Sequence, residues 1–577
     1  MSSLPATQRL VGLVLLAALS HACSSDGNTA ANSTDDATDS LGDEGSGDDG
    51  GDTNGSGDDT EVDDGDDTSA VDTTPPGPLT FGPHGSLVAP SGRGGFSFGV
   101  ATAATQIEDS NPAVDWFTWT APAPDGLGNG TFVGDAVQGY TRAIPDLDLV
   151  TAMNLDTYRF SIEWARVEPR RDEIDTAALA HYGEVLDAMR TRGITPNITV
   201  HHFSNPTWVH DPRDKDCREG SGDTNLCGWS VEGDASQLIG EIAEHAALLA
   251  STYGDRVDNW ATFNEPFNYI LAGYGFGSFP PGQNLLLSDF DRLVATYRNL
   301  LDAHAAIYDA IKQNDTIDAD GDGVAAAVGL TLNVISWQPA RANRPSEDPA
   351  DIAAAERMDY AYNRFVPGSI LAGTFDVDLD GVVDEQHPDW AGKLDWLGVQ
   401  YYFRGGVTAK SQAIRQLGLT PCYPPIDFGS CIPPEDSTKW IPEMRYEYWE
   451  PGIYEILKDF GTRWPNLPMI VSESGLATEV GRRRSEHVVR SLEQVHRAID
   501  EGVDVRGYYH WSLTDNFEWA EGFGPRFGLY TVDYSTYERS PTEGAITLGE
   551  IAGSRSITTE QRERLGGLGP MTEETAR

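Results

Sequence analysis

Two glutamates stand directly beyond short apolar runs of the sequence. Glu265 comes at the end of residues 260–264, and Glu473 follows residues 470–472. If both runs are parallel strands, each delivers one carboxylate to the same rim of the sheet. Cleavage of an acetal needs such a pair, because one acid protonates the leaving oxygen while the other carboxylate attacks or activates water. We therefore take Glu265 and Glu473 as the catalytic candidates.

Other residues near the ends of apolar runs suit a sugar. A hexose offers flat C–H faces and a ring of hydroxyls, so it is bound by aromatic rings and by amide or carboxylate groups. Gln106, His202, Asn264 and Glu518 are of these polar types. Asn264, directly before the presumed acid, can bond the sugar 2-hydroxyl, where interactions strengthen in the transition state. Each residue taken alone is more often structural, and only the set favours function.

Eight short apolar or β-branched runs can position these residues. From residue 96 onward they alternate with longer stretches of helical periodicity, which is typical of βα units. The runs are 96–102, 157–162, 195–202, 259–264, 326–334, 394–402, 469–472 and 507–513. Eight parallel strands predict an α/β fold, a closed (β/α)8 TIM barrel with its site at the C-terminal strand ends. Its length of about 470 residues exceeds the ~250 typical of the fold, so long βα loops are expected.

The motifs around these residues resemble glycoside hydrolase family 1, from about residue 95 to residue 541. Thr262-Phe263-Asn264-Glu265-Pro266 resembles the acid/base motif of the family, and Val471-Ser472-Glu473-Ser474-Gly475 resembles its nucleophile motif. Further stretches resemble family motifs in the same order: 96–108, 158–164, 201–203 and 511–519. The resemblance implies a retaining β-glycosidase in which Glu473 is the nucleophile and Glu265 the acid/base.

The resemblance also implies roles for residues around the two carboxylates. It places Arg159 beside the nucleophile and Tyr402 in a hydrogen bond to it. It assigns sugar contacts to Gln106, His202, Trp511, Glu518 and Trp519. Arg159 is expected to favour the ionised form of Glu473, whereas Glu265 faces a second carboxylate and is expected to have a raised pKa.

Three positions bear on the substrate. Ser474 and Gln400 stand where the family usually has Asn, which puts the fine hydrogen bonding around Glu473 in doubt. Glu518 argues against a 6-phosphate substrate, because a carboxylate there would repel the phosphate. Loops such as 213–229 and 420–440 are expected to build the pocket for the leaving group.

The expected enzyme is an exo-acting hydrolase of terminal β-D-glucosyl residues that tolerates β-galactosides or β-fucosides. It should need no cofactor for catalysis and should take a β-linked glycoside or oligosaccharide as its partner. The alternatives are a transglycosidase on the same scaffold and an idle sugar-binding lipoprotein at the cell surface. A formal charge of -50 over 577 residues makes nucleic acid an unlikely partner.

The N-terminal part of the chain indicates export. Arg9 precedes the apolar run 10–19, which is shorter than the ~20 residues that span a bilayer but suits the core of a signal peptide. Cys23 directly after Ala22 resembles a bacterial lipoprotein cleavage site, and the alternative is ordinary cleavage after Ala22. Residues 24–78 hold 17 Asp or Glu and no Lys, Arg or aromatic residue, which predicts a disordered spacer.

These features predict the organisation of the whole chain. We expect an exported protein, lipid-anchored in a bacterial membrane and facing the periplasm or the exterior, with no other membrane contact. Its segments are a signal peptide at 1–22, a lipidated Cys and tether at 23–80, a barrel domain at 81–560 and a polar tail at 561–577.

The cysteine count fits export. Five cysteines are present, and setting Cys23 aside leaves two short-range pairs, Cys217 with Cys227 and Cys422 with Cys431. Disulfides are expected at both pairs in an oxidising compartment, and four unpaired thiols are the alternative.

Two loops fit the DxDxDG pattern of calcium sites. Their aspartates are Asp318, Asp320 and Asp322 in the first loop and Asp376, Asp378 and Asp380 in the second. Neither loop has Glu at the twelfth position, so an EF-hand is not expected, and Asp384 or Glu385 could complete a looser site. The loops precede neighbouring strands and so belong at the bottom of the barrel. We expect one or two structural Ca2+ ions, with plain acidic turns as the alternative.

Overall fold

The computed structural model describes residues 76–220, 222, 224–422 and 428–574. The predicted signal peptide, Cys23 and nearly all of the predicted tether lie outside the described residues. Within the described part, no helix combines the length and the apolarity needed to cross a bilayer.

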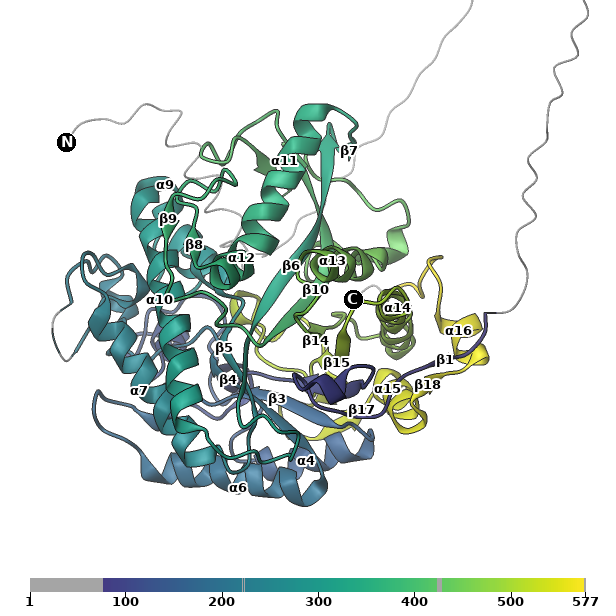
Figure 1. Ribbon diagram of the computed structural model, residues 1–577, viewed down its shortest axis with the longest axis horizontal. Coiled ribbons are helices and arrows are strands. Elements are labelled where there is room, and N and C mark those ends of the chain that lie inside the picture. Colours follow the sequence, from purple (N-terminus) through teal and green to yellow (C-terminus); the bar gives the residue numbers. More distant parts are fainter. Residues whose placement is uncertain (1–75, 221, 223, 423–427, 575–577) are drawn as a thin grey trace, which may run out of the picture. The chain divides into compact units, whose positions relative to one another are not determined.

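Eight parallel strands close into a barrel (Figure 1). In order around the barrel they are β2 (Ser97–Ala101), β3 (Thr157–Ser161), β4 (Thr195–His201), β5 (Asn259–Asn264), β6 (Ala327–Arg341), β10 (Trp396–Thr408), β14 (Met469–Ser474) and β15 (Val505–Trp511). The last strand pairs in parallel with the first, from Gly507 opposite Ser97 to Trp511 opposite Ala101, which closes the ring. The predicted TIM barrel is confirmed.

A helix follows each strand and packs outside the barrel (Figure 1). The principal helices are α4 (Ala143–Ala152), α6 (Thr176–Arg192), α7 (Ser236–Tyr253), α10 (Phe290–Asn314), α11 (Pro349–Asp359), α13 (Pro451–Arg463), α14 (Gly481–Asp500) and α15 (Glu543–Ser554). Their limits follow local chemistry. In α6, the Asp175 side chain accepts from two first-turn N–H groups, and Gly193 ends the helix at a φ of 71°.

The core lies between the strands and the helices. Strands β2, β3, β5 and β14 are buried along their whole length, as expected of a parallel sheet covered on both faces. Large side chains fill the layer, including the fully buried Trp164 and Trp260. Trp396 belongs to a second buried cluster, with Ile470 and Tyr509 of neighbouring barrel strands.

Strands β6 and β10 run well beyond the limits that the sequence predicts. They stay paired past the rim, as far as Val407 opposite Pro339. The prediction stopped early because β10 continues through Gly405 and Gly406, and glycine is uncommon in strands. A Cβ on Gly405 would lie 2.7 Å from the Trp337 ring, so glycine is what allows the strand to pack over that tryptophan.

Both ends of the described chain join the barrel. β1 (Leu79–Thr80) pairs antiparallel with β18 (Ser556–Ile557). α16 (Thr559–Leu565) follows and begins with a capping box. The sequence predicts a polar tail from residue 561, but Leu565 and Met571 are 2% and 4% exposed, so this segment packs against the domain.

The cysteines outside the N-terminal segment are paired. Disulfides join Cys217 to Cys227 and Cys422 to Cys431. Each bond closes a loop between a barrel strand and its helix.

The two acidic loops form separate groups of carboxylates. Oxygens within 4.8 Å of one another come from Asp258, Asp318 and Asp320 in the first group, and from Asp376, Asp378 and Asp384 in the second. Two of the six predicted ligands are outside these groups: Asp322 accepts from Ser86, and Asp380 accepts from the backbone N–H of Val382. Asp258, directly before β5, was not predicted.

Candidate active site

The C-terminal ends of the barrel strands surround one pocket. Nine of the predicted site residues line it: Gln106, His202, Asn264, Glu265, Tyr402, Glu473, Trp511, Glu518 and Trp519. Arg159 is fully buried and contacts two of them from below. The structure therefore brings together every catalytic and sugar-binding residue that the sequence predicts.

Glu265 is turned toward the pocket by its backbone. It lies between the end of β5 and the start of α8 (Pro266–Ile270), in the left-handed region at φ 42° and ψ 57°. A non-glycine residue there costs on the order of 1 kcal/mol, a strain that is common at functional sites. The backbone N–H of Glu265 donates to the Thr331 carbonyl at 2.8 Å, which fixes the turn to β6.

Glu473 is held by a cation and a phenol. The Arg159 guanidinium donates to one carboxylate oxygen at 2.5 Å, and the Tyr402 hydroxyl donates to the other at 2.8 Å. The strand end is tightly fitted: a Cβ on Gly475 would lie 2.0 Å from the Trp511 carbonyl oxygen, so glycine permits the approach of β14 to β15.

Among the residues that the structure describes, no cation donates a hydrogen bond to Glu265. Its hydrogen bonds come from the amides of Asn268, at 2.8 Å, and Asn333. Burial, together with the charge of Glu473, raises the pKa of Glu265 to about 8. Burial also raises the pKa of Glu473, but Arg159 and Tyr402 oppose that shift. When the pair shares one proton, Glu265 holds it and Glu473 is the anion.

The side chain of Asn264 is oriented by three donors. Its Oδ1 accepts from Arg159 Nη2 at 2.7 Å, from Thr331 Oγ1 at 2.8 Å and from Gln400 Nε2 at 2.8 Å. The oxygen is therefore fully used, and the amide nitrogen is left to donate into the pocket. Gln400, one of the two departures from the family pattern, takes part in this orientation.

Ser474, the other departure, faces away from the pocket. Its hydroxyl lies 3.4 Å from Nε2 of the buried His487 on α14. Ser474 thus does not reach the carboxylate of Glu473, and the polar partners of that carboxylate come from other strands.

Gln106 and Glu518 form one wall of the pocket. Gln106 Nε2 donates to the Phe517 carbonyl at 2.9 Å, while its Oε1 is buried without a partner among the described residues. An orphaned buried acceptor is costly, and a sugar hydroxyl would satisfy it. Burial and the charge of Glu473 raise the pKa of Glu518 to about 8, so at neutral pH this carboxyl can donate as well as accept.

Aromatic rings complete the same wall. Trp511 and Trp519 line the pocket with the His202 ring between them, at centroid distances of 6.2 Å and 5.9 Å. Burial lowers the pKa of His202 well below its usual value, so the imidazole is neutral. Flat rings and a neutral imidazole suit the apolar face and the hydroxyls of a sugar.

Several lining residues were not predicted from the sequence. They are Phe203, Asn268, Phe279, Asn333, Tyr362, Phe403, Met444, Tyr446 and Phe527, among others. Asn268 could have been found, because it stands three residues after Glu265 at the start of a helix. No described residue of the expected loops 213–229 and 420–440 lines the pocket. Met444 and Tyr446, which follow the second of these loops, line it instead.

Comparison with known proteins assigns this site to a family. Residues 91–556 match the sequence profile of Glycosyl hydrolase family 1. The chain belongs to glycosyl hydrolase family 1. It is thus an O-glycosyl hydrolase of the β-glucosidase type that works with retention of configuration. Family 1 enzymes need no cofactor for catalysis.

Relatives cover nearly the whole folded region. The β-galactosidase of Sulfolobus acidocaldarius is 30% identical over 523 residues, spanning 83% of this chain and 98% of its own. A bifunctional β-D-glucosidase/β-D-fucosidase of Bifidobacterium breve is 30% identical over 485 residues, spanning 77% and 94%. The solved structure of a family 1 β-glycosidase from Pyrococcus horikoshii matches with a TM-score of 0.68 at 31% identity, covering 83% of this chain and 98% of that one.

A family 1 relative has been solved with a sugar mimic. The β-glucosidase of Thermotoga maritima in complex with deoxynojirimycin matches this chain with a TM-score of 0.64 at 26% identity, covering 82% of this chain and 99% of that one.

Proposed function

We propose that Glu473 is the nucleophile and Glu265 the acid/base of a double displacement on terminal β-D-glucosyl residues. The observation that supports this assignment is the asymmetry of two buried carboxyls in one pocket. Glu473 is bound by Arg159 and Tyr402 and is ionised, whereas Glu265 is bound only by amides and is protonated.

The two steps follow from this asymmetry. Glu473 attacks the anomeric carbon while Glu265 gives its proton to the leaving oxygen, which forms a glycosyl-enzyme ester and releases the aglycone. The ionised Glu265 then takes a proton from water, which attacks the anomeric carbon and frees Glu473. Asn264 donates to the 2-hydroxyl, where the interaction strengthens as positive charge develops on the sugar ring.

We infer that glucose is the preferred sugar and that galactose and fucose are tolerated. Glu518 and Gln106 lie side by side, with Gln106 Nε2 3.4 Å from a Glu518 oxygen, and can bind a pair of adjacent hydroxyls. Relatives named β-galactosidase and β-D-glucosidase/β-D-fucosidase support a site that accepts these three sugars.

A panel of aryl β-glycosides tests the assignment. Glu473→Ala and Glu265→Ala are each expected to lower kcat by several orders of magnitude with 4-nitrophenyl β-glucoside. Added azide should restore turnover in both variants, giving the α-glycosyl azide with Glu473→Ala and the β-glycosyl azide with Glu265→Ala. Wild-type activity in Glu473→Ala would overturn the mechanism.

We further propose one or two structural Ca2+ ions at the acidic loops. Each of the two groups offers three carboxylates within 4.8 Å, which suits a hard cation with oxygen ligands. Calcium should raise the melting temperature, and Asp376→Asn should reduce the shift more than Asp380→Asn, which lies outside the group. A melting temperature that responds to neither calcium nor chelator counts against the ions.

We also propose that the protein is exported and anchored through a lipid on Cys23. The short apolar run 10–19, the small residue before Cys23 and the acidic residues that follow support this proposal. Mass spectrometry of the mature N-terminus in a bacterial host should find a diacylglyceryl cysteine, and Cys23→Ser should move the protein to the soluble fraction. Mature wild-type protein without lipid would disprove the anchor.

A further inference from the structure

One wall of the pocket is a short hairpin, residues 440–447. β12 (Trp440–Ile441) pairs antiparallel with β13 (Tyr446–Glu447). Met444, in the turn, and Tyr446 line the pocket. The hairpin belongs to the loop between β10 and α13, outside the motifs that hold the sugar, so it borders the space for the leaving group.

The second strand of the hairpin pairs with a barrel strand. Glu447 lies opposite Arg404 of β10 and forms an ion pair with it, at 2.5 Å and 3.0 Å. Tyr446 stacks on Phe403 with ring centroids 4.7 Å apart and planes 11° from parallel. β12 is at the outer edge of the sheet and has no barrel strand beside it.

Residues 568–574, here called the C-terminal strap, contact the segment that leads into the first strand, whose Ile441 is buried in the core. The backbone N–H of Met571 donates to Thr438 Oγ1, and Lys439 Nζ donates to the Leu568 carbonyl, each at 2.8 Å. Arg483 of α14 donates to the Trp440 carbonyl at 2.7 Å and reaches the Thr572 carbonyl at 3.5 Å. Three consecutive residues at the base of the hairpin thus contact the strap or an arginine shared with it.

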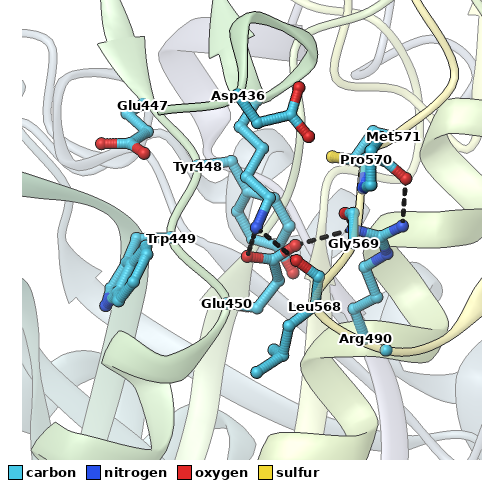
Figure 2. Close-up of polar contacts among 12 residues, drawn as sticks. Asp436, Glu447, Tyr448, Trp449, Glu450, Arg490, Leu568, Gly569, Pro570 and Met571 are labelled. Atoms are coloured by element: carbon cyan, nitrogen blue, oxygen red, sulfur yellow. Dashed lines mark hydrogen bonds and ion pairs between the residues drawn. The ribbon is translucent and has the colours of Figure 1, made fainter. Parts of the chain in front are cut away.

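A buried group of charges makes the strap necessary. Glu450 is fully buried and lies between two buried cations, with Lys439 Nζ at 2.9 Å and Arg490 Nη1 at 2.7 Å (Figure 2). The two cations share their ion pairs with this one carboxylate, and the more distant Asp436 and Glu447 add attraction. Buried charge of this kind needs further hydrogen bonds.

Main-chain carbonyls of the strap supply those bonds. Arg490 donates to the carbonyls of Gly569 at 2.7 Å and Pro570 at 2.8 Å (Figure 2). Lys439 donates to the carbonyl of Leu568. Removing the strap would leave both cations short of acceptors, and Lys439 directly precedes the hairpin. The free-energy cost of these unsatisfied cations would therefore destabilise the residues at the base of the hairpin.

We propose that the C-terminal strap is a positioning element that sets the leaving-group side of the pocket by holding hairpin 440–447 in place. This inference rests on the proposed glycosidase function. Within the described part of the chain, the strap contacts none of the groups that hold the sugar or carry out the chemistry. Its loss therefore weakens the binding of substrates with long leaving groups and leaves the chemical step intact.

Two substrates with the same sugar separate these effects. The leaving group of β-D-glucosyl fluoride is a single atom, whereas cellotriose releases a disaccharide that extends along the wall. In the chain without residues 567–577, kcat/KM for cellotriose should fall about 10-fold or more because KM rises. For glucosyl fluoride, kcat/KM should stay within about 2-fold of wild type.

A second comparison asks whether the strap acts through the hairpin. Tyr446→Ala should lower kcat/KM for cellotriose in the full-length enzyme. In the shortened enzyme the Tyr446 side chain is already displaced, so the same substitution should lower kcat/KM much less. A strap that supports only overall stability predicts equal costs in both backgrounds.

Point variants keep the test decisive if the shortened chain does not fold. Thr438→Val removes the acceptor of Met571 N–H, and Met571→Ala removes a buried side chain of the strap; combined, they should show the same split between the two substrates. Ser437→Ala changes an exposed neighbour and should leave both substrates unaffected.

Equal losses for both substrates, or no loss for either, would overturn the positioning role. The wild-type enzyme is measured first with the same two compounds. If wild type turns over neither compound, the proposed glycosidase function fails. If wild type turns over both compounds but the strap variants lose activity equally on both, only the positioning role fails.

Discussion

Glu265 and Glu473 differ in the charge of the groups that bind them. Arg159 and Tyr402 stabilise the anion of Glu473, whereas the amides of Asn268 and Asn333 leave Glu265 as the stronger base of the pair. A retaining mechanism requires this division at its start, because one carboxyl must give up a proton while the other donates an electron pair.

The pH dependence of kcat/KM should show this division. Glu265 must be protonated for the first step, and its pKa is raised to about 8, so activity should be present below that pH and lost as pH rises through it. With a 2,4-dinitrophenyl glucoside, whose leaving group departs without a proton, Glu265→Gln should abolish this alkaline limb. An alkaline limb that remains in Glu265→Gln would assign it to another group, such as Glu518.

The free amide nitrogen of Asn264 predicts a specific dependence on the sugar 2-hydroxyl. Removing that hydroxyl from an aryl glucoside should cost the wild-type enzyme about 10- to 100-fold more in kcat/KM than it costs Asn264→Ala. The comparison is a double-mutant cycle between protein and substrate. Equal costs in the two enzymes would show that Asn264 does not donate to this hydroxyl.

At the scale of elements, the cluster of Glu450, Lys439 and Arg490 joins α14, the pocket hairpin and the C-terminal strap. Glu450→Gln removes the carboxylate that forms ion pairs with both buried cations, so it should lower the free energy of unfolding by about 3–5 kcal/mol in urea denaturation. The ion pair of Arg170 with Glu173 is 77% and 60% exposed and provides the control. Glu173→Gln should cost less than about 1 kcal/mol; a similar cost for both variants would contradict the role given to burial.

Periodicity and strand-end chemistry predicted the barrel and its two carboxylates, and the resemblance to glycoside hydrolase family 1 predicted most of the sugar pocket. Each of the eight strands was recognisable from its own residues, and the positions of Glu265 and Glu473 after two of them defined the rim. The continuation of β10 was missed because Gly405 and Gly406 are uncommon in a strand, and that of β6 because Pro339 is also uncommon there. That pairing is a property of two strands in contact, and neither sequence run contains it alone.

The strap and Asp258, a carboxylate of the first acidic group, were missed for a related reason. Residues 568–571 are mostly Gly, Pro and apolar residues without periodicity, and their role depends on carbonyl groups that every sequence has. Asp258 belongs to the first acidic group only because β5 and β6 are neighbours. Contacts between distant segments carry no local pattern.

At the scale of the molecule, charge is unevenly divided. Residues 24–78 account for 17 of the 50 excess negative charges, which leaves 33 on the rest of the chain. Self-repulsion among these carboxylates opposes the compact state, and salt screens it.

Salt should therefore stabilise the folded domain. Raising NaCl from about 0.05 M to about 0.5 M should increase the melting temperature by a few degrees in a chelator-containing buffer, as measured by calorimetry. A chain without residues 1–75 should show the same increase, because the repulsion lies within the domain. A melting temperature that falls or stays constant with salt would contradict this account.

The link between Lys439 and Leu568 also has a consequence in time. The two residues are 129 positions apart in the chain. At a synthesis rate of about 5–20 residues per second, the hairpin leaves the ribosome roughly 10 s before the segment that holds its first strand. By the end of this interval every residue that lines the pocket has been made, as far as Phe527, but this wall is still unsecured, so this side of the pocket is completed last.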